Sequence, residues 1–193
     1  DEGVKNPSTS LGFGFAGGFY MQIPINNNIS INPEILYSQK SSSFEYDYVY
    51  DYDINQRDYY SSKSSIILSY VELNPTLSYL ASYNLSLNIG PSIHYMISSK
   101  HEYEQTLTNS EDETTSPEIL ADGVFDEQSL DIGLNAGISY YLNENFILNT
   151  TIYSGFMKIG DVLRPIDIQN DEPTTNLKLS NIRVSFSYLF WNL

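Results

Sequence analysis

The 193-residue sequence contains no cysteine, which excludes a disulfide framework and a thiolate metal site. It has no apolar run of about 18 residues, so it contains no transmembrane helix. A basic segment followed by an apolar one is missing from its start, and we expect any secretory signal to lie outside this sequence. Basic residues are few, with 9 Lys and Arg against 24 Asp and Glu, and the net charge of −15 would repel the phosphates of nucleic acid.

The acidic residues that are present gather in a few places. All but Glu34, Glu72, Asp131 and Glu144 lie at the first two positions or within 45–58, 102–127 and 161–172. Between these acidic stretches the chain is nearly neutral. This distribution divides the sequence into uncharged segments and long acidic connections.

The uncharged segments alternate apolar and polar residues with the period of a β-strand. Seven show the pattern: 10–23, 29–40, 66–80, 85–98, 130–142, 146–159 and 177–191. Their second face carries small or polar residues rather than the long charged side chains of a solvated sheet. A membrane barrel predicts this composition, with apolar side chains toward lipid and small or polar ones toward a narrow lumen. A lipocalin-like barrel would reverse the two faces, and a soluble sandwich would carry more charge.

The connections support a membrane barrel. Three are short and rich in turn-forming residues (24–28, 82–84 and 143–145), and they alternate with long acidic ones at 45–62, 102–128 and 160–175. We therefore predict a single outer-membrane domain over 1–193, with the short turns in the periplasm and the long loops, together with 1–9, outside. The stretch 44–63, rich in Tyr and Asp, would be an extracellular hairpin tip. Aromatic residues near strand ends suit interfacial girdles: Tyr20, Tyr37, Phe44, Tyr79, Tyr95, Tyr140, Phe146, Phe190 and Trp191.

Several strand segments resemble one known family. The segments "PEILYSQK", "YVELNPTLSY", "NIGPSIHYMIS", "LDIGLNAGISYYL" and "VSFSYLFW" are similar to the PorT-like outer-membrane β-barrel domain of Bacteroidota. One departure is Asn74, inserted before Pro75 where the family has Pro directly after a Glu-apolar pair. The resemblance implies an all-β, antiparallel, up-and-down barrel of eight strands. Most members have no assigned activity, and the member that gives the name belongs to the type IX secretion machinery.

The strand count is one short of eight. With the long loops outside, segments 10–23 and 177–191 both run toward the periplasm, and seven strands would leave an open edge in the bilayer. We therefore expect the first, N-terminal strand to be missing from this sequence. A strand from another chain is the alternative.

Strand parity places five ionisable residues in the lumen: Glu34, Glu72, His94, Asp131 and Arg183. The same parity adds Asn32, Asn74, Asn88, Asn135 and Tyr70. We expect these side chains to form a polar plug of ion pairs and hydrogen bonds, because an eight-stranded lumen is only wide enough to be filled by side chains. A proton or ion path is the alternative.

Catalytic and metal-binding chemistry find little support. There is no Gly-x-Ser-x-Gly motif, and His101, beside Ser98, Ser99, Glu102 and Glu104, is better explained as an exposed histidine at the base of a loop. Asp51, Asp53 and Asn55 begin like a calcium loop, but Gln56 stands where Gly is needed. We predict no catalytic residue, cofactor or metal.

Five lysines lie near the outer ends of strands, at the depth of lipid phosphates: Lys40, Lys63, Lys100, Lys158 and Lys178. They are candidates for contacts with lipopolysaccharide. They equally suit a simpler role, in which they offset an acidic rim.

Three functions remain open. The first is a non-catalytic accessory subunit of a larger outer-membrane complex for secretion, assembly or uptake, with other outer-membrane proteins as partners. The second is a stand-alone surface adhesin or receptor that uses the Tyr-rich loop, since Tyr makes good contacts at low entropy cost. The third is a hydrolase at the membrane rim.

Overall fold

The computed structural model describes residues 3–10, 12–53, 56–108, 113–116, 130–162 and 175–189. Across these ranges the chain forms β-strands and turns without a helix. No helix capable of crossing a membrane was found in them.

The strands follow one another along the chain with few interruptions. They are β1 (Gly3–Ser10), β2 (Phe15–Tyr20), β3 (Ile23–Pro24), β4 (Ile29–Asp53), β5 (Gln56–Ser82), β6 (Leu85–Thr108), β7 (Glu113–Ser116), β8 (Leu130–Tyr141), β9 (Phe146–Gly155), β10 (Gly160–Val162), β11 (Thr175–Leu177) and β12 (Ser180–Tyr188).

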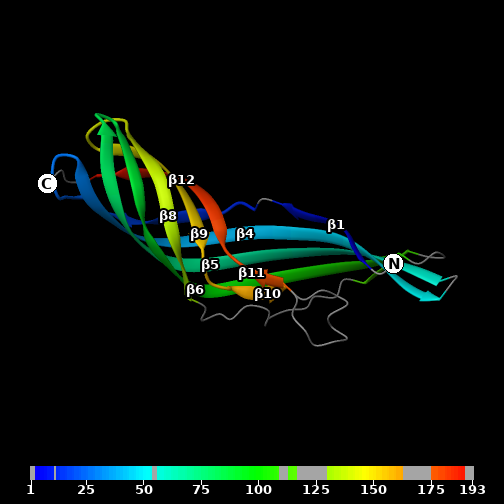
Figure 1. Cartoon of the computed structure of the whole chain (residues 1–193). Coiled ribbons are helices and arrows are strands. Elements are labelled where there is room, and N and C mark those ends of the chain that lie inside the picture. Colours follow the sequence, from blue (N-terminus) through cyan, green and yellow to red (C-terminus); the bar gives the residue numbers. More distant parts are fainter. Residues whose placement is uncertain are drawn as a thin grey trace. The chain divides into compact units, whose positions relative to one another are not determined.

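One sheet contains most of these strands in the order β1-β4-β5-β6-β8-β9-β12. The short strands β2 and β3 also pair with β4, so β1, β2 and β3 occupy the same place in the order. The pairs β6–β8, β8–β9 and β9–β12 are antiparallel, and β8, β9 and β12 lie side by side in Figure 1. The predicted class, an all-β antiparallel barrel, is confirmed, with seven strand positions in a nearly closed barrel.

The chain divides into two compact units, and the second contains residues 16–38, 70–97 and 124–193. In this unit the burial of side chains alternates along each strand. Residues 130–141 of β8, for example, are exposed at even positions and buried or half-buried at odd ones. The exposed set includes Ile132, Leu134 and Ile138, whereas Asp131, Asn135 and Ser139 are buried. The polar face therefore lines the interior, and the apolar face points outward, as a membrane barrel requires.

Two turns of the second unit use the same hydrogen bonds. The side-chain oxygen of Asn26 accepts from the backbone N–H groups of Asn28 and Ile29, each at 2.9 Å. Asn143 accepts in the same way from Asn145 and Phe146. These asparagine turns explain why the short connections are asparagine-rich.

The first unit contains residues 1–15, 39–69 and 98–123. Here β1 pairs with the second half of β4, from Gly3 opposite Val49 to Ser10 opposite Ser43, and β7 pairs with the end of β6. With 25, 27 and 24 residues, β4, β5 and β6 are more than twice as long as the roughly ten residues that a barrel strand needs to cross a bilayer. Most of the Tyr-rich stretch 44–63 is therefore strand rather than irregular loop.

The expected strand over 10–23 is interrupted. The structure has no strand at residues 12–14, where a Cβ on Gly12 or Gly14 would lie 1.6 or 2.1 Å from the backbone oxygen of Ser41 or Gln39. Ser41 Oγ also donates a hydrogen bond of 2.5 Å to the backbone oxygen of Phe13. Glycine permits this close approach, which breaks the regular ladder.

The last predicted strand, 177–191, began too early. Leu177 belongs to β11, which pairs with β10 in a separate two-stranded sheet, and β12 starts at Ser180. The strand expected over 146–159 ends at Gly155. Phe190 and Trp191 lie outside the described residues.

Candidate functional site: a polar network in the lumen

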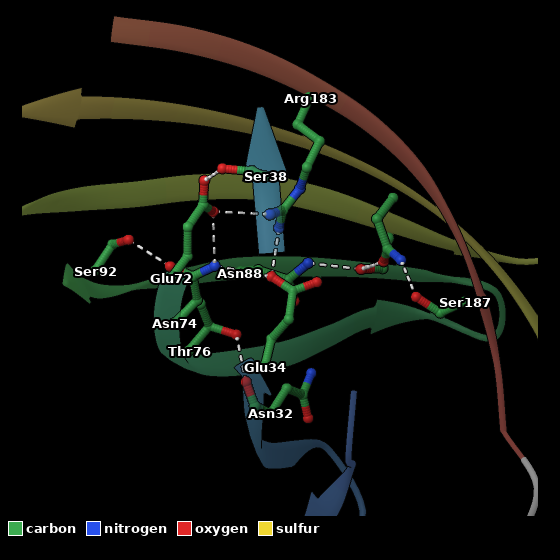
Figure 2. Close-up of polar contacts among 12 residues, drawn as sticks. Asn32, Glu34, Ser38, Glu72, Asn74, Thr76, Asn88, Ser92, Arg183 and Ser187 are labelled. Carbon is green, nitrogen blue, oxygen red and sulfur yellow. Dashed lines mark hydrogen bonds and ion pairs between the residues drawn. The ribbon is translucent and has the colours of Figure 1, made fainter. Parts of the chain in front are cut away.

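Arg183 on β12 forms the centre of a charged cluster in the second unit. Its Nη2 donates to Glu34 Oε2, and its Nη1 lies 3.3 Å from Glu72 Oε2 (Figure 2). The three side chains come from β12, β4 and β5, so one guanidinium bridges two carboxylates from strands that are neighbours to each other but not to β12. A buried carboxylate needs such a partner, because leaving it unpaired in a low-dielectric interior is costly.

Uncharged groups complete the shell around the two carboxylates. Asn74 Nδ2 lies 3.0 Å from Glu34 Oε2 and 3.5 Å from Glu72 Oε2, and Ser38 Oγ donates to Glu72 Oε1 at 2.5 Å. Ser92 in turn donates to Asn74 Oδ1. Asn74, which contacts both carboxylates and Ser92, is thus central to this cluster (Figure 2).

A second cluster surrounds Asp131. Tyr153 OH donates to Asp131 Oδ2 at 2.7 Å, and the backbone N–H of Met157 lies 3.3 Å from Asp131 Oδ1. The ring of His94 stacks on Tyr153 with 3.9 Å between centroids, and His94 Nε2 lies 3.6 Å from Glu72 Oε2. His94 therefore connects the Asp131 cluster to the Arg183 cluster.

A chain of uncharged hydrogen bonds crosses five neighbouring strands of the same unit. Ser78 donates to Asn88 Oδ1, and Asn88 Nδ2 donates to Ser139 Oγ, each at 2.6 Å. Ser139 donates to Asn149 Oδ1 at 2.5 Å, and Asn149 Nδ2 donates to Ser187 at 2.9 Å. Donors and acceptors match at every step, which is the arrangement that stabilises a buried polar network.

These contacts leave little empty space between the strands. A cavity lined by Tyr20, Glu34 and Arg183, among others, measures about 30 Å³. Since a buried water needs about 10–15 Å³ on the same measure, this cavity has room for about two waters at most. A larger cavity, about 240 Å³, lies by the asparagine-rich turn and is lined by uncharged residues including Gln22, Asn26 and Tyr141.

The structure places the five ionisable lumen candidates as follows. Glu34, Glu72 and Arg183 form one cluster, His94 adjoins it, and Asp131 is reached through Tyr153. Four other side chains belong to these networks but were not among the predicted members: Ser38, Ser92, Asn149 and Tyr153. Tyr153 and Asn149 share the inward parity of β9, so a strict alternation count from Ile147 would have found both.

Tyr20 was wrongly assigned to the aromatic girdle. It is half-buried and lines the small lumen cavity, on the same face of the chain as Gln22, whose side chain donates to Tyr141 OH at 3.1 Å. Tyr37, Tyr79, Tyr95, Tyr140 and Phe146 are exposed. The side chain of Phe44 lies outside the described residues.

His101 in the first unit has a partner that the sequence did not indicate. Its Nε2 lies 2.6 Å from Ser64 Oγ on β5, and burial lowers the pKa of the imidazole from its usual value of 6.5. Ser64 is buried and His101 is half-buried rather than exposed, so the pair is partly shielded from solvent. That position suits a structural contact better than a nucleophile and base awaiting substrate.

The remaining candidates are the five lysines and the three residues that resemble the start of a calcium loop. Lys63, Lys100, Lys158 and Lys178 are exposed and Lys40 is half-buried; Lys63 lies 3.7 Å from Glu45. No group of three metal-ligating side chains occurs among the described residues. The side chains of the calcium candidates Asp51, Asp53 and Asn55 are not part of the description.

Comparison with known families settles the class. A family model described as "Outer membrane protein beta-barrel domain" matches residues 1–161. The chain belongs to this family. Its members are outer-membrane barrels, and the outward apolar face and inward polar face of this chain agree with that location. Searches of curated proteins and of solved structures gave no match.

Proposed function

We propose that this outer-membrane barrel is a non-catalytic accessory subunit of a larger outer-membrane complex for secretion, assembly or uptake. The packed lumen is the observation that carries this role. A barrel filled by the Arg183 cluster and the serine–asparagine chain has little room for solute passage. Its usable surfaces are then the lipid-facing wall and the parts of the chain beyond the membrane.

Two further features support a role in a complex. β4, β5 and β6 are much longer than a strand needs to be to cross a bilayer. The parts beyond the bilayer can bind a neighbouring protein through their backbone and side chains. The resemblance to the PorT-like domain of Bacteroidota points to the same class of role. We propose that these extensions face outside the cell.

Purification from native membranes in mild detergent tests this function. A larger assembly of fixed stoichiometry, retained by an affinity tag on this chain, is the expected result. The matched control is the same chain carrying Ser64→Ala and His101→Asn, which removes the serine–histidine pair and should copurify the same assembly. A lone barrel would contradict the proposal and favour a surface adhesin or receptor, and loss of a hydrolase activity in the control variant would favour an enzyme.

We also propose that exposed lysines of this chain contact the phosphates of lipopolysaccharide. Lys158 and Lys178 are exposed in the second unit, and a lysine near lipid headgroups adds about 1 kcal/mol of attraction to an anionic surface. The double variant Lys158→Gln, Lys178→Gln should lower the thermal stability gained in vesicles with lipopolysaccharide over plain phospholipid vesicles. If the stability gained with lipopolysaccharide is unchanged, these two lysines do not contribute to lipopolysaccharide binding.

A further inference from the structure

The larger cavity of the second unit lies at the end of the lumen where the short connections are. On each of five segments one of its lining residues stands two positions from a lining residue of the small cavity, so both belong to the inward face. The pairs are Tyr20 and Gln22, Asn32 and Ser30, Thr76 and Ser78, Asn88 and Ser86, and Ser139 and Tyr141. The second residue of each pair is the nearer one to a connection, at 25–28, 83–84 or 142–145. We call this space the mouth cavity.

The mouth cavity has an uncharged lining. In the part of the chain that the structure describes, its walls carry amides and hydroxyls, from residues such as Gln22 and Ser30, together with the apolar side chains of Ile29 and Leu80. A charged ligand that leaves water for this site would find no opposite charge, and that loss is costly. The lining therefore suits a neutral ligand that has both hydrogen-bonding groups and apolar surface.

The hydroxyl of Tyr141 is positioned to donate into the mouth cavity. It accepts a hydrogen bond of 3.1 Å from Gln22 Nε2, which holds the ring in place. Ser86 Oγ lies 3.5 Å away, beyond the roughly 2.5–3.0 Å of a strong O–H···O bond. Tyr141 is half-buried and lines the cavity. A ligand oxygen there would give its hydroxyl a closer acceptor than the described residues provide.

The backbone around the mouth cavity is already hydrogen-bonded, which disfavours a peptide ligand. The N–H groups of Ile25 and Asn26 donate to Ile29 O, and Leu80 N–H donates to Asn28 O. A peptide that adds to a sheet needs free backbone groups, and such groups are taken here. Side-chain amides remain available instead. Those of Asn27 and Asn28 line the cavity and have no partner among the described residues.

Tyr83 adds an aromatic ring at the rim. It is fully exposed in the two-residue connection between β5 and β6, and it also lines the mouth cavity. Its ring combines a flat apolar face with a polar hydroxyl. A sugar ring has the matching pattern, with hydroxyls around its edge and C–H groups on its faces. The cavity volume of about 240 Å³ is just below the roughly 300–1,000 Å³ of drug-sized ligand pockets, so it admits one ring.

We propose that the mouth cavity binds a neutral sugar ring. The hydroxyls of the sugar bond to the Tyr141 hydroxyl and to the amides of Asn27 and Asn28, and one face of the sugar lies against Tyr83. With the short turns in the periplasm, as the connections predict, free sugars and the glycan of the cell wall both supply such a ring. This binding does not depend on whether the barrel joins a complex.

Saturation-transfer NMR titration of the full-length protein tests the site. The protein is purified in a zwitterionic detergent, because detergents with sugar headgroups would compete. Glucose and N-acetylglucosamine are the neutral rings, glucuronate is the charged ring, and capped triglycine amide is the neutral peptide. The variants are Tyr141→Phe and Tyr83→Ala. Their matched controls are Tyr140→Phe and Tyr79→Ala, at exposed tyrosines that do not line the cavity.

The expected result is saturable binding of a neutral sugar to the unmodified chain. Tyr141→Phe should weaken it about two- to tenfold, which is the worth of one neutral hydrogen bond. Tyr83→Ala should weaken it as well, and both controls should bind like the unmodified chain. If no neutral sugar binds, or if both variants keep the full affinity, the mouth cavity is not a sugar site. Tighter binding of glucuronate or of the peptide would replace the proposed ligand.

Two further measures complete the test. Tyr83 lies in an exposed connection, so Tyr83→Ala still tests the site if Tyr141→Phe fails to fold. Cosedimentation with purified cell-wall glycan separates the two sources of the sugar. Cosedimentation that Tyr83→Ala weakens assigns the glycan, whereas binding of a monosaccharide without cosedimentation assigns a free sugar.

Discussion

Replacing Arg183 by Met should destabilise the barrel strongly. The guanidinium contacts Glu34 and Glu72, and the relative exposures of the three side chains are 18%, 13% and 5%. At an effective dielectric of about 20, two unit charges 4 Å apart attract with about 4 kcal/mol. Two such attractions, reduced by desolvation and by the repulsion between the carboxylates, leave a net loss of about 3–5 kcal/mol when the cation is removed.

Compensating variants separate the charge effect from loss of packing. In the double variant Glu34→Gln, Arg183→Met, one carboxylate remains, and Glu72 keeps its hydrogen bonds from Ser38 and Asn74. The double variant should therefore be more stable than Arg183→Met alone. In vesicles without lipopolysaccharide, Lys178→Met, the same kind of change at an exposed position, should stay within about 0.5 kcal/mol of the unmodified chain.

Unfolding in urea from lipid vesicles, followed by the fluorescence of the single tryptophan, gives the free energies. If Arg183→Met unfolds within about 0.5 kcal/mol of the unmodified chain, the cluster is not a buried ion-pair network. The same conclusion follows if removing Glu34 lowers the stability of Arg183→Met further.

Three other perturbations follow from the contacts. Tyr153→Phe removes the hydroxyl donor to buried Asp131 and should cost about 1–3 kcal/mol in the same assay, whereas Tyr140→Phe on the outer face should be nearly neutral. Gly155→Ala would place a Cβ 2.3 Å from Asp131 Oδ2 and should cost about 1–3 kcal/mol, while Gly17→Ala, with nothing within 4 Å, should cost much less; equal costs would contradict the crowding. Burial lowers the pKa of His101, so the unfolded chain binds a proton at higher pH than the folded chain does: the full stability is present above the unfolded pKa of 6.5 and is lost as the pH falls from there through the lower pKa of the folded state. The protection of amides near Ser64 and His101, taken relative to the intrinsic exchange rate at each pH, should fall between about pH 7 and pH 5, and His101→Gln should remove that fall.

The alternation of the sequence was sufficient to predict the barrel and the facing of its strands. Ile93 and His94 illustrate why: in a strand, adjacent side chains point to opposite faces, so composition alone separates lipid from lumen. Strand ends were predicted less well. Nothing in the pattern of 10–23 showed that Gly12 and Gly14 would approach the backbone of residues 39–41 and break the strand.

The sequence also did not predict which side chains contact each other within the lumen. The alternation of side chains along each strand predicts that Arg183, Glu34 and Glu72 face inward. Which of them contact each other depends on the stagger between strands that are far apart in the chain. Tyr20 was misassigned because an aromatic residue near a strand end suits both an interfacial girdle and a lumen. Its parity, shared with Gln22, decides between the two.

The Arg183 cluster also attaches β12 to the rest of the barrel. Among the described residues, β12 has a backbone ladder with β9 alone, so its attachment to the far side of the lumen depends on side chains. Arg183 provides that attachment by reaching Glu34 on β4 and Glu72 on β5, neither of which neighbours β12 in the sheet order. A charged cluster is a costly way to fill a narrow lumen, since apolar packing of equal volume is often as stable. Its advantage is specificity. The ion pairs of Arg183 fix the stagger of β12 against β4 and β5, whereas apolar side chains pack in more than one stagger.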